Sequence, residues 1–490
     1  MVKYKRMIDK AAAYFKKNGI RQGIYRIYRK LLLARPVDYE MWQRRACLSS
    51  KETQALLQRY TEIISQMEIC ECLQEVLQTE KAYVLVAPQN GKLENSALPL
   101  FAEVVARHPQ ADLVYCDSDR LQPDGVHLTE PLFKPEFDDI LLEGMSYVDG
   151  GFLVKRELLE QCIEDLKRED KYWAYKLFCL CSKKSSGIFH VARMLYHAPP
   201  DGEILYQNRK TKKTDRHLVS ILIPNKDQVK MLQTCVESIY AQAGNADFEI
   251  LILENNSREK ETFSYYNELE YSGKARIIKW KAEFNYSAVN NYGAKKANGD
   301  YLLFLNNDTE FKGEDVLGEL LKYAEKENVG AVGAKLLYPD GTVQHAGIIL
   351  GYGGIAGHVF EGMTEEELQK IPWSRAARQY SAVTAACMLV KKSVFAEIGG
   401  FDETFPVAYN DIDLCLRIRE SGKQIVYTPF AQVIHYESAT RGLELTAEKA
   451  QRVKREEEHF RVRWQERLAE GDPFYNPNLT LEKNDYSLRR

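Results

Sequence analysis

Blocks of apolar and polar residues alternate along the second half of the chain, and they predict strands separated by helices. Short apolar runs rich in β-branched residues predict strands at 218–223, 248–253, 276–280 and 301–305. Apolar residues recur at helical spacing from Val229 to Ile239, and Ser287 is a candidate N-cap for a helix that ends near Ala297. This alternation predicts a mostly parallel sheet with helices on both faces.

Three polar clusters follow three of these strands, at 224–227, 254–257 and 306–309. Ligands of such sheets bind beyond the carboxyl ends of the strands. The three clusters therefore predict one shared site.

The remaining residues divide into three regions. Residues 1–75 have a helical pattern, 76–206 alternate short apolar runs with helix-like stretches, and 441–490 read as a charged helix followed by an irregular tail. A charged linker at 207–217 precedes the α/β region, which we place at 218–440. A chain of 490 residues has room for these domains.

Composition and charge exclude several classes of protein. The net charge of −3 does not mark a nucleic-acid binder, so we expect no nucleic-acid partner. The ten cysteines are scattered without zinc-like spacing, which favours free thiols in a reducing cytosol. No apolar run approaches the ~20 residues that span a bilayer, and no signal-peptide core follows Met1, so we expect a cytoplasmic location.

The first 35 residues depart from this neutral balance. Between Lys3 and Arg35, eleven Lys and Arg residues are set against Asp9 alone, and the apolar residues between them have roughly helical spacing. A basic amphipathic helix of this kind could lie on an anionic membrane surface. The alternative is a helix that packs its apolar stripe on the next domain.

Individual residues in the α/β region could carry chemistry. Asp308 directly follows the strand at 301–305 and could hold Mg²⁺ or Mn²⁺ against a diphosphate, since such sites use one or two protein carboxylates. The alternative is a polar turn that ends the strand. His435 and His345 each follow a strand-like run and could be ligands or structural histidines.

Asp411 and Asp413 open a run that reads as a helix. Negative charge at a helix N-terminus is stabilising, which explains at least one of the two without any chemistry. A carboxylate in that position that faces a cleft could also act as a general base.

Taken together, these segments resemble a known family. Residues 219–441 are similar to the family 2 glycosyltransferases with the GT-A fold, and most similar to the bacterial branch that builds O-antigens, capsules and rhamnose-rich polysaccharides. The segments that carry the resemblance occur in the order 219–227, 254–257, 284–294, 302–309, 399–403, 409–417 and 435–438. The expected fold is therefore a mixed α/β sheet of the GT-A kind, preceded by a helical segment and a partial GT-A-like module.

The resemblance implies a role for each matching residue. The residues that would line or approach the nucleotide are Pro224, Asp227, Glu254, Asn255, Asn290, Asn291, Gly293 and Asn306. Asp308 matches the last acid of the family's DXD metal motif, and His435 matches a position that reaches the metal or diphosphate. Asn306 departs from the usual first Asp of that motif. Asp411 matches the catalytic base.

These roles imply an inverting glycosyltransferase with a divalent cation, Mg²⁺ or Mn²⁺, as cofactor. The donor would be a nucleotide sugar, with dTDP-rhamnose as the first expectation. The acceptor would be a growing cell-surface polysaccharide or a lipid-linked glycan. Enzymes that extend lipid-linked carriers work at the inner face of the cytoplasmic membrane, where the basic segment at 3–35 would provide peripheral contact.

The first half resembles the middle and end of a second such module, at 114–119, 133–137 and 150–159. The position of the metal motif follows the apolar run at 83–86, but residues 87–91 contain no carboxylate, and no first nucleotide-binding strands are evident upstream. We therefore predict a degenerate GT-A-like module at 76–206. Asp117 and Asp119 match a later segment of the family and are expected to be structural.

Two other functions compete with the enzyme. The chain could be a non-catalytic sugar-binding or scaffolding protein of a polysaccharide assembly complex, although such a protein would not need both Asp308 and Asp411. A nucleotidyltransferase of similar topology would need a Gly-rich phosphate loop after its first strand. Residues 224–227 are not such a loop.

Overall fold

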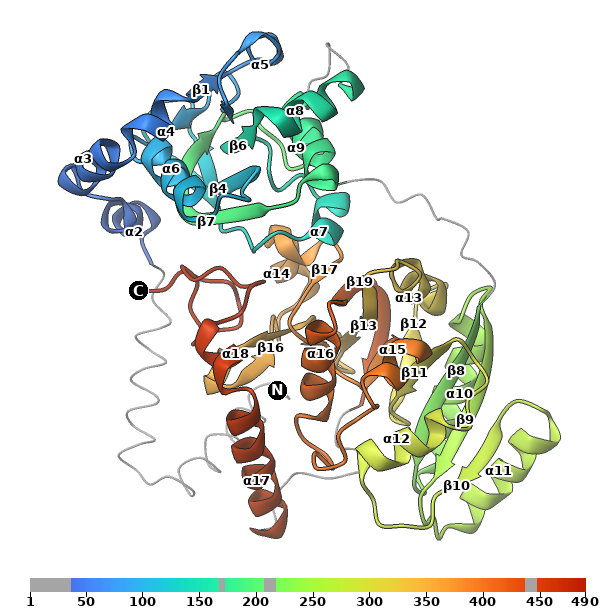
Figure 1. The fold of residues 1–490 in the computed structure, drawn as a ribbon. Coiled ribbons are helices and arrows are strands. Elements are labelled where there is room, and N and C mark those ends of the chain that lie inside the picture. The colour runs from blue at the N-terminus through green and yellow to red at the C-terminus, as the bar shows by residue number, and fades with distance from the viewer. Residues whose placement is uncertain (1–36, 167–171, 207–216, 437–446) are drawn as a thin grey trace.

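The computed structural model describes residues 37–166, 172–206, 217–436 and 447–490. These form two α/β halves, each built on its own sheet (Figure 1). The basic segment at 3–35 and all but the last residue of the 207–217 linker lie outside the described residues. No helix in the described ranges combines the length and apolar character needed to cross a bilayer.

The C-terminal half contains a ten-stranded sheet, and eight of its strands form the path β10-β9-β8-β11-β18-β13-β19-β12. In chain order these are β8 (Leu218–Asn225), β9 (Asp247–Glu254), β10 (Arg276–Lys279), β11 (Tyr301–Leu305), β12 (Thr309–Lys312), β13 (Val329–Leu337), β18 (Cys387–Lys391) and β19 (Gln424–His435). Two side strands, β14 (Val343–His345) and β17 (Arg378–Gln379), pair with β13 and β19.

The four strands predicted in this half are confirmed, and they are parallel neighbours. The sheet beyond them is mixed, because β18 runs antiparallel to both β11 and β13. The prediction of a mostly parallel sheet therefore holds for β10, β9, β8 and β11, whereas the wider expectation of a mixed α/β fold is confirmed for the whole half.

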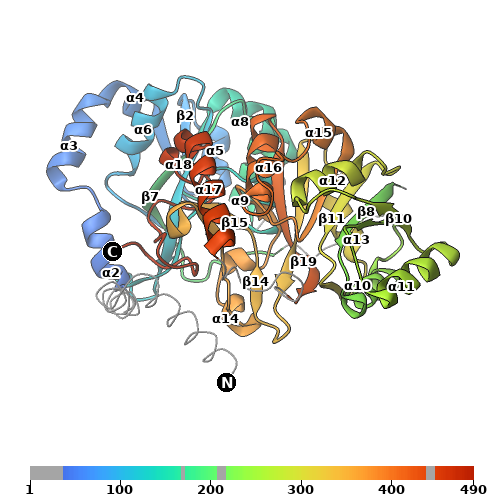
Figure 2. The same ribbon diagram turned by 90° about the horizontal axis from the view of Figure 1, so that it is seen from below.

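Helices cover both faces of this sheet, as predicted. One face packs on α10 (Val229–Gln242), α11 (Lys260–Tyr271) and α13 (Val316–Ala324), and the other on α12 (Tyr286–Ala294), α15 (Lys392–Glu397) and α16 (Asn410–Glu420), as Figure 2 shows. Successive strand residues alternate between the two cores, so that Leu222 belongs to one and Ile223 to the other. The fully apolar strands follow from burial on both sides.

The predicted cap of α12 is wrong by two residues. Asn285 is the N-cap and accepts a hydrogen bond of 3.0 Å from the Ala288 N–H. Ser287 lies inside the helix, and its hydroxyl donates to the Phe405 carbonyl at 2.6 Å. Both side chains favour a helix start, and the contact with Phe405 decides between them.

An insertion and two C-terminal helices complete this half. The insertion between β14 and β17 contains β15 (Ile348–Leu350), β16 (Ala356–His358) and α14 (Glu365–Gln369). The charged end of the chain forms α17 (Ala447–Arg463) and α18 (Gln465–Glu470), and an irregular tail follows, as predicted.

The N-terminal half has a seven-stranded sheet in the order β1-β2-β6-β4-β7-β3, with β5 beside β4. Its strands are β1 (Met67–Cys70), β2 (Tyr83–Val86), β3 (Lys92–Leu93), β4 (Leu113–Leu121), β5 (Leu128–Leu132), β6 (Phe152–Lys155) and β7 (Ile188–Ala198). Its helices are α2 (Tyr39–Ala46), α3 (Ser50–Arg59), α4 (Thr61–Ser65), α5 (Leu73–Gln78), α6 (Ala97–Arg107), α7 (Asp139–Gly144), α8 (Arg156–Cys162) and α9 (Trp173–Lys184).

The prediction that residues 1–75 are helical is wrong at β1. Met67 and Cys70 are buried where this strand pairs in parallel with β2. Four residues are too few to establish a strand period in the sequence, so the surrounding helical pattern concealed it.

The two sheets share one strand path. In chain order, β1 to β7 correspond to β8, β11, β12, β13, β14, β18 and β19. Whenever two strands pair in the N-terminal sheet, their equivalents pair in the C-terminal sheet, in the same parallel or antiparallel direction. Strands equivalent to β9 and β10 do not occur between β1 and β2. The repeat includes one strand, β1, upstream of residue 76, and the degenerate GT-A-like module at 76–206 stays a prediction.

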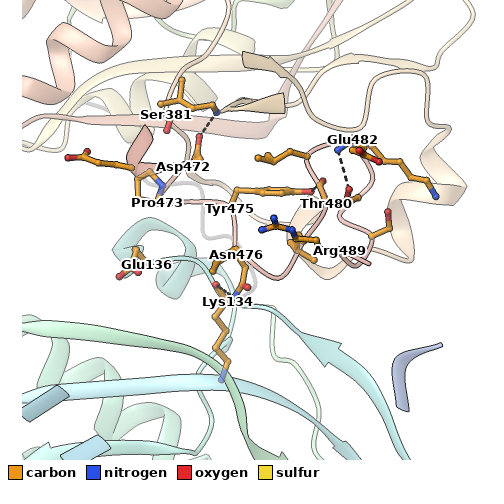
Figure 3. Close-up of a pocket in the computed structure, with 18 of the residues that line it drawn as sticks. Lys134, Glu136, Ser381, Asp472, Pro473, Tyr475, Asn476, Thr480, Glu482 and Arg489 are labelled. Carbon is orange, nitrogen blue, oxygen red and sulfur yellow. Dashed lines mark hydrogen bonds between the residues drawn. The ribbon is translucent and has the colours of Figure 1, made fainter. Parts of the chain in front are cut away.

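The C-terminal tail joins the two halves. Its Asn476 side chain donates to both carboxylate oxygens of Asp117 at 3.0 and 2.9 Å, and to the Lys134 carbonyl at 2.9 Å. Figure 3 shows Asn476 beside Lys134, at the edge of a cavity of about 870 Å³ between the tail and both halves. A second contact joins α7 to β17, where the Gln379 N–H donates to Asp138 at 2.8 Å.

The buried amide of Asn476 is expected to stabilise the whole chain. Asn476→Ala removes the two amide hydrogen bonds to Asp117, a carboxylate with no exposed surface. Leaving a buried charged acceptor short of donors costs about 1–3 kcal/mol. We therefore expect a lower midpoint of urea unfolding. Asn484→Ala removes one exposed bond to the Glu361 carbonyl and is the matched control. Equal midpoints for the two variants would contradict this role.

Candidate active site

The three polar clusters predicted to share one site are in contact. The Asn255 N–H donates to the Asn225 carbonyl at 2.9 Å, and the Asn307 amide donates to the Asn225 side chain at 2.6 Å. Since β9, β8 and β11 are parallel neighbours, their carboxyl ends meet at one edge of the sheet. The sequence placed this edge correctly.

The residues predicted to line a nucleotide pocket shape this edge. Asp227 accepts main-chain hydrogen bonds from Arg258 and Glu259 at 2.6 and 2.9 Å. Glu254 accepts the Ser257 N–H at 2.6 Å, and the Asn255 amide donates to the Ala282 carbonyl at 3.2 Å. Pro224, half-buried, lies one residue before Asn225. These bonds brace the loops after β8 and β9, and contact with a nucleotide stays a prediction.

The three predicted residues of α12 are engaged within the protein. Asn290 is fully buried, and its amide donates to the Tyr286 carbonyl at 2.9 Å. Asn291 holds the loop at 399–403, because it exchanges hydrogen bonds of 2.9 Å with the main chain of Phe401. Gly293 lets the helix approach the sheet, where a Cβ atom would come within 2.7 Å of Leu253. Their prediction as nucleotide contacts therefore remains untested.

Asp308 and His435 face each other at the end of the sheet. The antiparallel pairing of β12 with β19 sets Thr309 opposite His435, which brings the preceding Asp308 alongside. The Asp308 carboxylate is buried, and its Oδ1 lies 3.2 Å from His435 Nε2. The Asn306 amide lies 3.2 Å from the same nitrogen. The structure thus brings together the residues that the sequence predicted as metal ligands.

Gln344 determines how His435 presents its ring. The side-chain oxygen of Gln344, on β14, lies 2.6 Å from His435 Nδ1. In the neutral form of His435 that donates from Nδ1 to this oxygen, the lone pair of Nε2 points toward Asn306 and Asp308. A carboxylate oxygen and an imidazole lone pair then face each other, which is the donor set of a divalent cation whose remaining ligands come from a phosphate and water.

The size of this donor set is limited. Nowhere in the described residues do three or more His, Cys, Asp or Glu side chains form a group that could hold a metal by themselves. Asp308 and His435 fit a cation that also binds a diphosphate, because such sites take only one or two ligands from the protein. Asn306, in place of an acid, lowers the negative charge offered to the cation.

Asp411 and Asp413 have different surroundings at the start of α16. Asp413 has no exposed surface and accepts from Arg417 at 2.8 Å and from the Trp464 indole at 3.1 Å, so its role is structural. Asp411 is half-buried and accepts the Ala385 N–H at 3.3 Å. The next residue, Ala386, accepts the Asn306 N–H at 3.1 Å, which links the loop beside Asp411 to the Asp308 end of the sheet.

The C-terminal helix positions the start of α16, which the sequence did not indicate. Glu456 on α17 is buried and accepts the N–H groups of Val407 and Ala408 at 3.1 and 2.5 Å. Tyr409 then takes a positive φ of 62° immediately before the helix. Because these contacts fix the chain before Asp411, α17 belongs to the site although it lies outside the region that we assigned to the catalytic domain.

His345 is a structural histidine beside the site. It is fully buried, and its Nε2 accepts the Thr384 N–H at 3.4 Å. Burial and the neighbouring His358 and His435 keep its pKa well below the usual range. A neutral ring here adds no positive charge next to His435.

The acidic pair of the N-terminal half is satisfied internally, in agreement with the structural role expected for it. Asp117 accepts a hydrogen bond from Asn476 and lies 2.9 Å from His190 Nε2. Asp119 accepts a hydrogen bond from Tyr39 and lies 2.6 Å from His197 Nδ1. Burial lowers the pKa of His197, but hydrogen bonds to Asp119 and Glu94 outweigh it and raise the pKa to about 9. The Asp119 charge is therefore paired at neutral pH.

The sequence of the chain is similar to those of several known proteins. Residues 220–399 match the family described as Glycosyl transferase family 2. The uncharacterized protein y4gI of Sinorhizobium fredii is 32% identical over 450 residues, covering 83% of this chain and 49% of that protein. The O-antigen biosynthesis protein RfbC of Myxococcus xanthus is 35% identical over 453 residues, covering 81% of this chain and 34% of that protein.

A shorter match comes from rhamnosyltransferase WbbL of Escherichia coli, which is 30% identical over 146 residues, 29% of this chain and 54% of that protein. The chain thus spans half or less of the first two relatives. The matched family segment contains β8, β9, β11 and Asp308, the parts that form the shared edge of the sheet. Residues 220–399 thus form a segment that is similar to glycosyl transferase family 2.

Proposed function

We propose that the chain is an inverting glycosyltransferase that moves a sugar from a nucleoside-diphosphate donor to a growing cell-surface polysaccharide or a lipid-linked acceptor. The observation that carries this proposal is the meeting of Asp308 with His435 Nε2, 3.2 Å apart, which Asn306 and the loop at 384–386 link to Asp411. The family match at 220–399, which contains Asn306, Asp308 and the loop at 384–386, supports it.

Asp308 and His435 are the residues that would hold a divalent cation, Mg²⁺ or Mn²⁺. Such a cation neutralises the charge that builds on a leaving diphosphate. Gln344 acts behind them as a positioning residue, since it fixes the ring of His435. The loops braced by Asp227 and Glu254 form the donor side of the site.

Asp411 serves as the general base in this proposal. Its carboxylate removes the proton from an acceptor hydroxyl while the hydroxyl oxygen attacks the anomeric carbon, and the nucleoside diphosphate leaves from the opposite side. One displacement of this kind inverts the anomeric configuration. The hydrogen bond from the Ala385 N–H stabilises the charged carboxylate and orients it.

The donor and acceptor are narrower proposals. A relative that is a rhamnosyltransferase and another that is an O-antigen biosynthesis protein support dTDP-rhamnose and a polysaccharide acceptor. Thermal protection of the full chain by a panel of nucleotide sugars would identify the donor. Protection by a different nucleotide sugar would contradict the proposed donor and leave the rest of the proposed function unchanged.

A non-catalytic sugar-binding or scaffolding protein is the alternative. Such a protein would need the fold. It would not need a half-buried carboxylate at Asp411, bound by Ala385, or a Gln344 side chain that holds the ring of His435.

Loss of the base should abolish transfer and spare binding. We expect Asp411→Asn to reduce donor turnover about 100- to 10,000-fold, because the amide cannot take up a proton. Donor affinity, measured by calorimetry, should stay near that of the wild type. Glu420→Gln, at the exposed far end of the same helix, is the control and should be fully active. Turnover by Asp411→Asn within tenfold of the wild type would remove the assignment, and no turnover by the wild type with any donor would favour the scaffolding alternative.

Loss of the positioning amide should weaken cation binding. Gln344→Leu leaves His435 Nδ1 without its acceptor, so the ring loses its fixed tautomer. We expect Mn²⁺ affinity in the presence of dTDP, measured by electron paramagnetic resonance, to fall about 10- to 100-fold. Gln344→Glu keeps an acceptor oxygen and should bind Mn²⁺ at least as well as the wild type. Equal Mn²⁺ affinity in the Leu variant and the wild type would show that Gln344 does not position His435.

The basic segment at 3–35 is proposed to give peripheral contact with the inner face of the cytoplasmic membrane. Each Lys or Arg near an anionic surface contributes about 1 kcal/mol, and salt weakens the attraction. Deletion of residues 1–35 should therefore reduce co-sedimentation with anionic liposomes and spare turnover of a soluble acceptor. Undiminished liposome binding by the truncated chain would leave this segment with a packing role only.

A further inference from the structure

We propose that the N-terminal half contains a second carbohydrate site, which binds an uncharged stretch of glycan and no nucleotide. The site is a cleft of about 750 Å³ lined by β4, β5, β7 and the loop before β6, and closed on one side by residues 369–375 of the C-terminal half. That the glycan belongs to the acceptor rests on the proposed function. The existence of the site does not.

The cleft lies where the repeated topology places the candidate active site. In the C-terminal half, the equivalents of β5, β7 and the loop before β6 are β14, β19 and the loop before β18. These carry Gln344, His435 and Ala385, respectively. Phe152 on β6 pairs with the last residue of β2, and Cys387 on β18 pairs with the last residue of β11, so Phe152 and Cys387 are equivalent. Asp149 of the cleft, three residues before Phe152, therefore corresponds to Thr384.

The nucleotide side of the N-terminal half is closed. The chain after β2, at 87–91, has no carboxylate, and strands equivalent to β9 and β10 are absent between β1 and β2. The buried ring of Tyr196 fills the space between this turn and the loop before β6. A Cβ atom at Gly91 or Gly150 would come within 2.5 or 2.7 Å of Tyr196. What remains open is the cleft along β4, β5 and β7.

The charges of the cleft fit an uncharged ligand better than a phosphate. Its lining carries four carboxylates, Asp119, Glu130, Asp149 and Glu203, and three cationic side chains, Arg120, Lys370 and Arg375. A diphosphate site would need an excess of positive charge or a cation. Carboxylates and guanidinium groups side by side can instead accept from and donate to hydroxyl groups, which are both donors and acceptors.

Part of this lining is already fixed and part is free to bind. Asp119 is held by Tyr39 and His197, and Arg120 lies 3.1 Å from Glu130. Asp149 and Glu203 have no hydrogen bond or ion pair to any other residue that the structure describes. Among the described residues, these two carboxylates are therefore available to accept from a sugar hydroxyl.

A flat surface completes the cleft. The guanidinium group of Arg375 stacks on the ring of Tyr206, 3.9 Å from its centroid, and the Tyr206 hydroxyl donates to the Pro372 carbonyl at 3.3 Å. Tyr206 and Pro372 add apolar surface next to the polar groups. Small-ligand sites combine apolar walls with a few placed polar groups in this way. Because Arg375 and Pro372 belong to the C-terminal half, a bound glycan would contact both halves.

The test uses the full chain and four neutral tetrasaccharides, namely rhamnotetraose, mannotetraose, maltotetraose and chitotetraose. Binding is measured by saturation-transfer NMR and titration, in the wild type and in the double variant Asp149→Asn/Glu203→Gln. Both side chains are on the surface of the cleft, so the fold should be kept, and unfolding midpoints verify it. We expect at least one tetrasaccharide to bind, and its affinity to fall at least tenfold in the double variant.

A matched variant in the other half separates the two sites. Asp308→Ala should leave tetrasaccharide binding unchanged and weaken dTDP binding in the presence of Mn²⁺. The double variant Asp149→Asn/Glu203→Gln should weaken tetrasaccharide binding and leave dTDP binding unchanged. The proposal is overturned if none of the four sugars binds, if the double variant binds as tightly as the wild type, or if a second dTDP occupies the cleft. A chain that binds a tetrasaccharide at the cleft but turns over no donor would refute the enzyme and keep this site.

Discussion

The pairing of β12 with β19 is the constraint on which the proposed chemistry depends. These strands lie more than a hundred residues apart in the chain, and their register sets Thr309 opposite His435. A shift of one residue would turn His435 to the other face of the sheet and separate it from Asp308. The buried carboxylate and the ring nitrogen 3.2 Å from it are therefore a product of the whole sheet.

The proposed base, Asp411, depends on a different set of contacts, which residues C-terminal to the matched family segment supply. Glu456 on α17 binds the main chain just before Asp411. The indole of Trp464, which directly follows α17, donates to Asp413, two residues after Asp411. Removal of α17 would therefore leave the N–H groups of Val407 and Ala408 without their acceptor. The C-terminal helix is thus part of the site rather than an appendage.

The repeated strand path explains why one chain can hold two such different halves. Both sheets keep the same strand neighbours and directions. In the N-terminal half, however, Tyr196 fills the space beside Gly91 and Gly150, Asp117 accepts from Asn476, and Asp119 lies beside His197. Acids that look like a metal motif in the sequence therefore hold the tail and the strands together. The proposed glycan cleft uses the part of the module that Tyr196 leaves open.

Much of the C-terminal half could be predicted from the sequence, because strands buried on both faces are continuous apolar runs and their polar ends mark one edge of the sheet. Asp308, His435 and Asp411 followed from motif order. Gln344 and Glu456 did not, since a lone Gln beside His345 and one of four Glu residues on a charged helix carry no signal in the sequence alone. Asn285 and β1 were missed because a local pattern cannot rank two candidate caps two residues apart or show a period in four residues.

The central claim is that Asp308 and His435 hold the cation that binds the donor diphosphate. Its most direct measurement is an anomalous difference map of the full chain crystallised with Mn²⁺ and dTDP. The account predicts one manganese peak per chain, about 2.1 Å from an Asp308 carboxylate oxygen and from His435 Nε2, with dTDP beside it. Density for dTDP in this site without a manganese peak at Asp308, or a peak at Asp117 and Asp119 of the other half, would contradict it.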